Sequence, residues 1–429
     1  MGLREFTSDE AVVAGRLAAL KDEAGSHSPS LLTLREQMPE LEIAVDACFI
    51  SNPYATQLFL DYFKSELLDT GAIRDVLEFY PSQNQVIGSL LAGHLGIPED
   101  RVFVGNGAIE IIQAVIHNFA KRRVLVTLPT FSSYYEFAEG RVDVVFHTLA
   151  KTDEFKLDPH DYLAKVAETE PDVVTLINPN NPDGSYFSYE DLLTILRGLP
   201  DDVTAIVDES FIHFAFEDLN LDIRSIIAEC EQFPNLVVVK SMSKDFGIAG
   251  IRAGYAVMHP DRIEALLRNG YLWNSNGLAE YFFRLYCRAD FLERYDIVRK
   301  QYILETQLFY RQLAKVGGVV VYPSMANFAL VEIVGGVTNK EVPLGLDMNS
   351  SHRFLSIYSK ALLTACPILG KVKVLRQWAG CYDLTPDANP IVGEVDEIAG
   401  FYQASGFMGH GFMMAPVMGR LIAQNIAEK

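Results

Sequence analysis

Three charged side chains stand where each could act on a bound ligand. Asp208 directly follows the apolar run 204–207, so its carboxylate would be partly desolvated and would favour a nearby cation or hydrogen-bond donor. Lys244 comes shortly after the apolar run 236–239 and offers an amine that can lose its charge when desolvated. Arg252 follows a glycine-containing loop, and a guanidinium can bind a phosphate through two hydrogen bonds. Together they predict a site with a carboxylate, a reactive amine and an anion-binding group.

The elements that would position these side chains alternate between strands and helices. Short, apolar, β-branched runs separated by helical segments are typical of a parallel sheet buried on both faces. The expected strands are 102–104, 124–128, 142–149, 173–177, 204–207 and 236–239, with helices at 84–95 and 109–119. Ligands of such sheets bind beyond the carboxyl ends of the strands. Because several of these ends carry polar, turn-forming residues, the sequence predicts one site assembled from several loops.

Each strand end also has a simpler interpretation when it is taken alone. Gly107 could form only a tight turn, or it could open a helix whose free N–H groups bind a phosphate. The residues 178–184 are of the types that favour turns and could form only a turn. Lys244 could be a surface lysine. Taken together, a phosphate cradle, a reactive amine and a buried carboxylate are what a pyridoxal phosphate enzyme requires.

The segment Ser241–Tyr255, SMSKDFGIAGIRAGY, resembles the pyridoxal-lysine signature of class I/II aminotransferases of fold type I. The segments 105–108, 129–134, 178–184 and 208–209 occur in that family's order and at similar distances. The likeness covers about residues 40–333, and the branch that it most resembles holds histidinol-phosphate aminotransferases and threonine-phosphate decarboxylases. It implies an α/β fold, with a fold-type-I large domain of mostly parallel sheet and flanking helices, followed here by an atypical α+β C-terminal lobe.

The resemblance implies a role for each matching residue. Lys244 would hold pyridoxal 5′-phosphate as a Schiff base and then move a proton, and Asp208 would pair with the pyridine nitrogen. Asn181 would donate to the ring O3′, and Tyr134 would stack on the ring face. The implied phosphate ligands are Gly107, Ala108, Ile109, Ser241, Ser243 and Arg252. Tyr80 resembles the tyrosine that reaches the phosphate of the neighbouring subunit, which implies a homodimer.

Phe211 and His213 both follow the aspartate and bear on the same site. Many relatives have a tyrosine three residues after the aspartate that donates to O3′, whereas this chain has Phe211. Losing one hydrogen bond of about 1 kcal/mol could change the pKa of the Schiff base without abolishing the chemistry. His213 could contribute to substrate binding or be a structural histidine.

The C-terminal residues, from about 334 to 429, resemble a different family. The segments 376–387 and 406–416 are similar to the C-terminal part of flavin-dependent amine oxidases of the D-amino-acid, glycine and sarcosine oxidase type. Aminotransferases usually hold the substrate α-carboxylate with an arginine near the chain's end, and no matching continuation is found. Arg353 and Arg376 could replace that arginine or lie on the surface. Because no GxGxxG motif follows a strand, FAD binding by this chain alone is not expected.

Composition narrows the class of partner. The chain has 429 residues with 36 Lys+Arg and 56 Asp+Glu, and its net charge of −20 argues against a nucleic-acid or anionic-membrane partner. No run reaches about 18 apolar residues, so no membrane span is expected. The N-terminus lacks the apolar core of a secretory signal. The five scattered cysteines suit reduced thiols, and we expect a cytoplasmic protein that acts on a small amino-acid substrate.

The charge is distributed unevenly along the chain. Residues 331–429 carry 8 Lys+Arg and 9 Asp+Glu, whereas residues 1–330 carry 28 and 47. This shift marks either a domain boundary near 330–335 or a less acidic lobe of one domain. With the two resemblances, we expect an N-terminal helical arm (1–45), a cofactor-binding large domain (46–275), a partial small domain (276–333) and an oxidase-like segment (334–429).

Three functions stay open from the sequence. The main hypothesis is a pyridoxal phosphate-dependent aminotransferase that acts on an amino acid or an amino-acid phosphate. The first alternative is a decarboxylase of a phosphorylated amino acid, because the choice depends on which Cα bond stands perpendicular to the ring. The second is a chimeric or truncated chain, or a fusion with an amine-oxidase fragment, that keeps the cofactor pocket. Such a chain would lack efficient turnover because the usual carboxylate-binding arginine is missing.

Overall fold

The computed structural model describes residues 12–13, 15–17, 19–20, 30–41, 51–271, 275–316, 319–333, 391–394, 402–405, 420, 422–424 and 426. The chain divides into one compact unit of residues 46–334 and another of residues 1–45 with 335–429. The oxidase-like segments 376–387 and 406–416 lie outside the described residues, as do Arg353 and Arg376.

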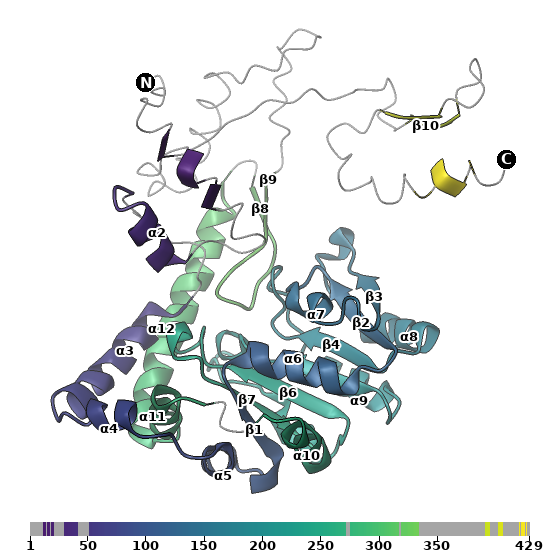
Figure 1. The fold of residues 1–429 in the computed structure, drawn as a ribbon. Helices are drawn as coiled ribbons and strands as arrows, with labels where there is room; N and C mark the ends of the chain where they lie inside the picture. Colours follow the sequence, from purple (N-terminus) through teal and green to yellow (C-terminus); the bar gives the residue numbers. More distant parts are fainter. Residues whose placement is uncertain are drawn as a thin grey trace. The chain divides into compact units, whose positions relative to one another are not determined.

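A seven-stranded sheet forms the centre of the unit 46–334 (Figure 1). Its strands are β1 (Val102–Gly105), β2 (Arg123–Leu128), β3 (Asp143–Thr148), β4 (Val173–Ile177), β5 (Thr204–Asp208), β6 (Leu236–Ser241) and β7 (Gly254–Met258). Their order is β1-β7-β6-β5-β4-β2-β3. β7 runs antiparallel to both of its neighbours, and the other strands run parallel to one another. The mostly parallel sheet predicted from the sequence is confirmed, while β7 is a strand that the sequence analysis does not single out.

Helices cover both faces of this sheet because successive strand residues point to opposite sides. In β5, Ala205 and Val207 join one apolar core cluster, whereas Ile206 joins the other. One face packs against α6 (Ala108–Phe119), α7 (Ser133–Glu136) and α10 (Pro260–Arg268). The other face packs against α5 (Asn84–Leu95), α8 (Pro159–Thr169), α9 (Tyr189–Gly198) and α11 (Gly277–Tyr286).

A long helix and a short sheet complete this unit. The helix α12 (Ala289–Leu313) lies beside α3 (Pro53–Phe63), which leads into a π-helix (Lys64–Leu68) and α4 (Ile73–Glu78) (Figure 1). β8 (Val319–Val321) and β9 (Val331–Ile333) pair in antiparallel fashion. Short 3-10 helices cover Glu99–Arg101, Lys151–Asp153, Ile212–Phe214, Ile226–Glu231 and Ala249–Ile251.

The other unit contributes few described elements. They include α2 (Leu31–Gln37) and the antiparallel pair of β10 (Ile391–Glu394) and β11 (Tyr402–Ser405), and the described residues within 12–20 and 420–426 are helical. α2 begins at Ser30, whose side chain accepts a hydrogen bond from Thr33 N at 3.0 Å. Across the described residues of both units, no helix combines the length and the apolar character needed to cross a membrane.

Candidate active site

The carboxyl ends of β1, β6, β5, β4 and β2 meet at one edge of the large sheet, and β7 begins at the same edge. The strand register places Gly254 opposite both Gly105 of β1 and Ser241 of β6. It also aligns Asp208 of β5 with Val239 of β6. The segments that the structure brings to this edge are 105–108, 178–184, 208–209 and 241–252.

The helix α6 starts at this edge without a side-chain cap. Its N-cap is Gly107, which has a φ of +82°. A Cβ added at Gly107 would lie 2.7 Å from Nη2 of Arg252, and one added at Gly254 would lie 2.7 Å from the backbone N of Ala108. The two glycines therefore let the guanidinium and β7 approach the start of the helix. The free N–H groups, the helix dipole and the guanidinium form an anion-binding cradle.

Two serine hydroxyls lie beside this cradle. Ser241 ends β6 next to Gly254, and Ser243 N donates to Ser241 Oγ at 3.2 Å. Both serines are buried, whereas Ile109 in the first turn of α6 is exposed. All the phosphate ligands expected from the sequence therefore lie at the same edge of the sheet, and their contact with a phosphate stays a prediction.

Asp208 ends β5 and is buried beneath the same edge. Its Oδ2 accepts a hydrogen bond from the Tyr134 hydroxyl at 2.6 Å, and its Oδ1 accepts one from Ser210 N at 2.8 Å. Burial raises the pKa of Asp208, while the hydrogen bonds from Ser210 and Tyr134 and the charge of Lys240 act in the opposite direction. A protonated ring nitrogen above this carboxylate would favour its charged form.

Tyr134 has a contact other than the ring stacking that the sequence predicts. It lies in α7, has no exposed surface and directs its hydroxyl to Asp208. A side chain with no accessible face cannot stack on a ligand in this arrangement. Phe131, three residues earlier, is partly exposed and packs at the margin of the same core cluster. The sequence analysis misses Phe131, although it occurs in the same motif.

Lys244 follows the end of β6 and is partly buried. Its carbonyl oxygen accepts a hydrogen bond from Asn52 N at 3.1 Å, which ties this loop to the start of α3. Asn181 is partly exposed, and its side chain has no hydrogen-bond partner among the residues that the structure describes. Both residues lie on segments that the structure brings to the edge where a ligand would bind.

Phe211 and His213 follow Asp208 and face protein rather than open space. Phe211 is buried and meets Phe328 edge-on at 5.0 Å between ring centroids. The Nδ1 atom of His213 lies 2.9 Å from the Tyr295 hydroxyl, and burial lowers the pKa of His213 well below its usual value. These are the contacts of a structural histidine.

A buried ion pair lies directly behind the site and is not anticipated by the sequence analysis. Lys240 Nζ donates to the carbonyl oxygen of Glu209 at 3.0 Å and pairs with the carboxylate of Asp245. Both side chains are almost fully buried. The sequence feature that could have indicated this ion pair is Lys240 itself, a charged residue that interrupts the apolar run of β6 one residue before its end.

Tyr80 follows α4 and is the residue expected to act on a neighbouring subunit. It is fully exposed, and its neighbours Leu77 and Phe79 are exposed as well. Its hydroxyl has no hydrogen-bond partner within the described ranges. The contact of Tyr80 with the phosphate of a neighbouring subunit stays a prediction.

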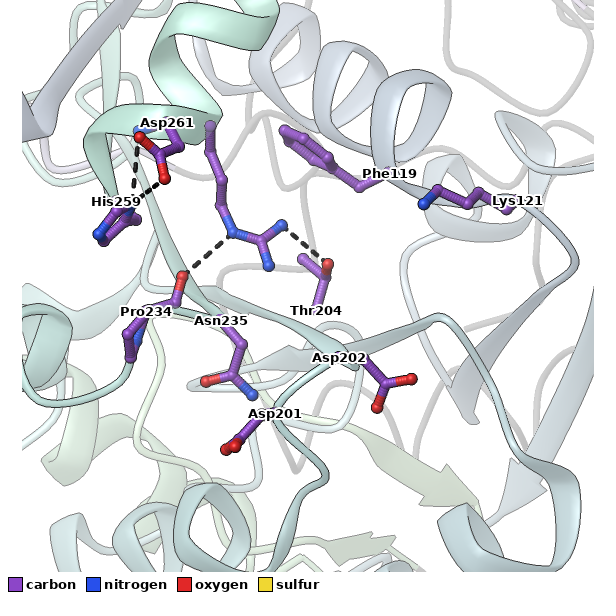
Figure 2. A pocket seen from close by; sticks show the side chains of 10 residues that line it. Phe119, Lys121, Asp201, Asp202, Thr204, Pro234, Asn235, His259 and Asp261 are labelled. Carbon is purple, nitrogen blue, oxygen red and sulfur yellow. Dashed lines mark hydrogen bonds and ion pairs between the residues drawn. The ribbon is translucent and has the colours of Figure 1, made fainter.

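A surface pocket of about 400 Å³ lies at the opposite edge of the sheet, where β5 and β6 begin (Figure 2). Its Arg262 donates to Pro234 O at 3.1 Å and to Thr204 Oγ1 at 2.9 Å, and its guanidinium lies over the Phe119 ring. The Arg262 guanidinium therefore already has hydrogen-bond partners and a ring contact within the protein. The pocket is separate from the strand ends that carry Asp208 and Lys244.

Comparison with known proteins agrees with this arrangement. A family model described as aminotransferase class I and II matches residues 51–347. The chain belongs to this aminotransferase family. An L-serine phosphate decarboxylase of Campylobacter jejuni is 54% identical over 329 residues, which are 77% of this chain and 84% of that protein. A histidinol-phosphate aminotransferase of Thermoanaerobacter is 31% identical over 247 residues, which are 56% of this chain and 66% of that protein.

Solved structures support the same assignment. The structure of a decarboxylase from Sulfurospirillum multivorans is 39% identical and superimposes with a TM-score of 0.73. The match covers 84% of this chain and 98% of the other. The resemblance to fold-type-I aminotransferases is therefore confirmed, and the relatives include decarboxylases. The hypothesis of a chain without turnover finds no support in these comparisons.

Pyridoxal phosphate is the cofactor of this family, and the residues present fit it. The cradle at the start of α6, with Arg252, suits the phosphate, because Gly107 leaves the space that a Cβ would fill. The buried carboxylate of Asp208 suits the ring nitrogen. Lys244 supplies an amine at the same edge of the sheet.

Replacing Gly107 with alanine is expected to weaken the binding of pyridoxal phosphate about 10-fold or more. Alanine is strained at a φ of +82°, and its Cβ would displace the Arg252 guanidinium. Titration of the apo-protein with the cofactor measures the effect. Gly140→Ala is the matched control, since Gly140 also has a positive φ but has no atom near its added Cβ. Equal affinities of the two variants would contradict the cradle.

A second family model, described as FAD dependent oxidoreductase, matches residues 298–425. It confirms the oxidase-like character of the C-terminal part, and it begins within α12, earlier than residue 334. The two matches overlap over residues 298–347. FAD binding by this chain alone is still not expected, because a GxGxxG motif after a strand is lacking in the sequence.

Proposed function

We propose that this chain is a pyridoxal phosphate-dependent decarboxylase of a phosphorylated L-amino acid, with L-serine phosphate as the first substrate to test. The observation that carries the proposal is the 54% identity to an L-serine phosphate decarboxylase over 84% of that protein. The relative from Sulfurospirillum multivorans, also a decarboxylase, supports it. The sequence-based alternative is thus preferred over the main hypothesis of an aminotransferase.

Decarboxylation breaks one bond to Cα and forms another, and residues of the chain would assist both changes. The bond between Cα and the carboxylate breaks, CO2 leaves, and a proton takes its place on Cα. Pyridoxal phosphate, when bound, accepts the electron pair of the breaking bond into its ring. Asp208 would hold a proton on the ring nitrogen, and the Tyr134 hydroxyl at 2.6 Å would fix the orientation of that carboxylate. Lys244 Nζ would anchor the cofactor covalently and later deliver the proton to Cα.

Other residues would hold the cofactor in place. The start of α6, with Ala108 and Ile109, would bind the phosphate together with Ser241, Ser243 and Arg252. The Asn181 amide would donate to the ring hydroxyl oxygen. Phe131, rather than Tyr134, would meet the ring face, because only Phe131 has accessible surface.

Product analysis tests the proposed reaction. The purified chain with pyridoxal phosphate and L-serine phosphate is expected to release CO2 and phosphoethanolamine in equal amounts, without an added keto acid. The control is the same mixture with L-serine, which lacks the phosphate. A keto-acid product that appears only with an amino acceptor would show transamination and reject the decarboxylase.

An aminotransferase is the second candidate, favoured by the likeness to histidinol-phosphate aminotransferases. It would require the Cα–H bond rather than the Cα–carboxylate bond to break. Histidinol phosphate has no carboxylate, so turnover of this substrate with a keto acid would support the second candidate directly.

We also propose that Tyr80 of one subunit completes the active site of another in a homodimer. Tyr80→Phe is expected to weaken pyridoxal phosphate binding roughly 10- to 100-fold, since it removes a hydrogen bond to a charged group. Mixing unfolded Tyr80→Phe and Lys244→Ala chains and refolding them together should restore tight sites, because each mixed dimer has one site with both Tyr80 and Lys244. Cofactor titration measures the recovery. A mixture that binds no better than its separate components would contradict a shared site.

A further inference from the structure

Lys240 lies in a position that is costly for a lysine. It is the last residue but one of β6, and only 1% of its surface is exposed. Burying an ammonium group is unfavourable unless it is paired and hydrogen-bonded. Its Nζ has two partners, the carbonyl oxygen of Glu209 at 3.0 Å and a carboxylate oxygen of Asp245. Apolar side chains of similar volume often stabilise a core as well as a buried ion pair does, so stability alone does not account for Lys240.

The two partners of Lys240 are the immediate neighbours of the two central site residues. Glu209 follows Asp208 at the end of β5, and Asp245 follows Lys244 after the end of β6. The Glu209 backbone is also held by β6, since Glu209 N donates to Val239 O at 2.8 Å. One ammonium group therefore ties the loop after Asp208 to the loop that carries Lys244.

We propose that Lys240 is a positioning residue for the cofactor: it fixes the loops of Asp208 and Lys244 relative to each other and places a buried positive charge at the end of β5, next to Asp208. This inference rests on the roles of Asp208 and Lys244 proposed above. Lys240 acts through these residues and does not itself contact the cofactor.

Several charged and titratable groups near Asp208 influence its pKa, and Lys240 acts on it in the opposite direction to burial. The titratable groups that act on Asp208 include Tyr134 of α7, the adjacent Glu209, Lys240 of β6 and Asp245. Lys240 is the cation among these groups, and its charge lowers the pKa of Asp208 against the effect of burial. Burial raises the pKa of Glu209 to about 7 and that of Asp245 to about 6. Both groups would add negative charge near Asp208 as the pH rises.

Asp245 has further neighbours on other elements. The groups that face it are Lys240 of β6, His213, Tyr255 of β7, Tyr286 of α11, and Tyr295 and Arg299 of α12. Burial keeps His213 neutral, because it lowers the pKa of this histidine well below its usual value. The tyrosines stay neutral as well, since burial raises the pKa of each. Removing the Lys240 and Asp245 charges together therefore takes away a positive charge that lowers the pKa of Asp208.

Three variants separate the charge of Lys240 from its packing. The double variant Lys240→Met/Asp245→Asn removes both charges at similar volume and leaves no unpaired ion. Asp245→Asn alone keeps the lysine charge and removes the negative one. Lys240→Arg keeps the positive charge in a larger side chain. Lys156→Met is the matched control, since Lys156 is an exposed lysine that pairs with Glu154.

The readout is the affinity of the apo-protein for pyridoxal phosphate across a range of pH, with thermal melting of the apo-protein alongside. In the wild type, affinity should rise with pH as Asp208 loses its proton. In the double variant we expect the midpoint of this rise in affinity to move to higher pH by about one unit. At a pH below the midpoint, this corresponds to about 10-fold weaker binding of the cofactor. Asp245→Asn should move the midpoint to lower pH. Lys240→Arg and Lys156→Met should keep the wild-type midpoint.

The outcomes separate this inference from the proposed site. A folded double variant with the wild-type midpoint would overturn the role of Lys240, and so would losses of affinity that only follow the losses of melting temperature. If the double variant does not fold, an unshifted or upward midpoint of Asp245→Asn overturns it equally. If Asp208→Asn leaves cofactor affinity unchanged at every pH, the proposed role of Asp208 itself fails.

Discussion

Lys244→Ala is expected to lower turnover by at least about 10⁴-fold, because the variant loses both the covalent anchor of the cofactor and the proton donor to Cα. The structure places Lys244 three residues after the end of β6, at the edge of the sheet where Asp208 ends β5. Turnover is measured as CO2 release from L-serine phosphate. The variant should also lose the visible absorbance of the enzyme-bound cofactor.

Covalent attachment gives a second readout for the same variant. Borohydride reduction of the wild type, followed by mass spectrometry, should place the cofactor on the peptide that contains Lys244, and the alanine variant should carry none. Lys165→Ala is the matched control, since Lys165 pairs with Glu168 on the surface of α8. Attachment to another lysine, such as Lys240, would contradict the assignment; the burial of Lys240 argues against it.

Asp208→Asn is expected to lower turnover by about 10²- to 10³-fold and to weaken cofactor binding. Asparagine has nearly the same shape, so it can keep partners among the Tyr134 hydroxyl and Ser210 while it removes the negative charge. Burial raises the pKa of Asp208 in the apo-protein. Below that pKa the carboxyl is protonated and cannot stabilise a protonated ring nitrogen, and above it the carboxylate can. Cofactor affinity of the wild type should therefore rise with pH over this range, and that of the variant should not.

Asp172→Asn is the control for the loss of a carboxylate elsewhere in the fold. Asp172 precedes β4 and accepts hydrogen bonds from Lys121 N at 3.0 Å and Arg123 N at 2.9 Å, at the other edge of the sheet. Its replacement should lower the melting temperature without a change in the pH dependence of cofactor binding. A flat wild-type profile, or the same loss of affinity in both variants, would argue against the proposed role of Asp208.

The sequence predicts the sheet well because its signal is local. Runs such as 173–177 and 204–207 are short, mostly apolar and rich in β-branched residues, which is typical of strands in a sheet buried on both faces. The polar residue that follows each run then marks the edge where a ligand binds. β7 is less evident, because Gly254–Met258 continues a loop signature and its antiparallel direction depends on tertiary pairing.

The roles of individual side chains depend on packing that the sequence does not record. Phe131 and Tyr134 are three residues apart in one motif, and only the placement of α7 decides which of them has accessible surface. Lys240 reads as a polar residue near a strand end, but its partners Glu209 and Asp245 come from two different loops. The sequence shows that Phe211 stands where many relatives have a tyrosine, whereas its contact with Phe328 is known only from the structure.

The choice between decarboxylation and transamination is another limit of local sequence signals. The motifs around Lys244 and Asp208 serve cofactor binding, which both reactions share. The preference for a decarboxylase comes instead from identity over most of the length of a relative. The C-terminal part differs from a complete aminotransferase, since the oxidase-like match begins within α12 and extends to residue 425.

Reaction of L-serine phosphate in deuterated water, followed by NMR of the product, tests the central claim most directly. If the chain is a decarboxylase, the product is phosphoethanolamine, and the carbon that was Cα retains its own hydrogen and gains one solvent deuterium. CO2 should appear in equal amount, and Lys244→Ala should form neither product. Loss of the Cα hydrogen to solvent with formation of a keto acid and no CO2 would contradict the account.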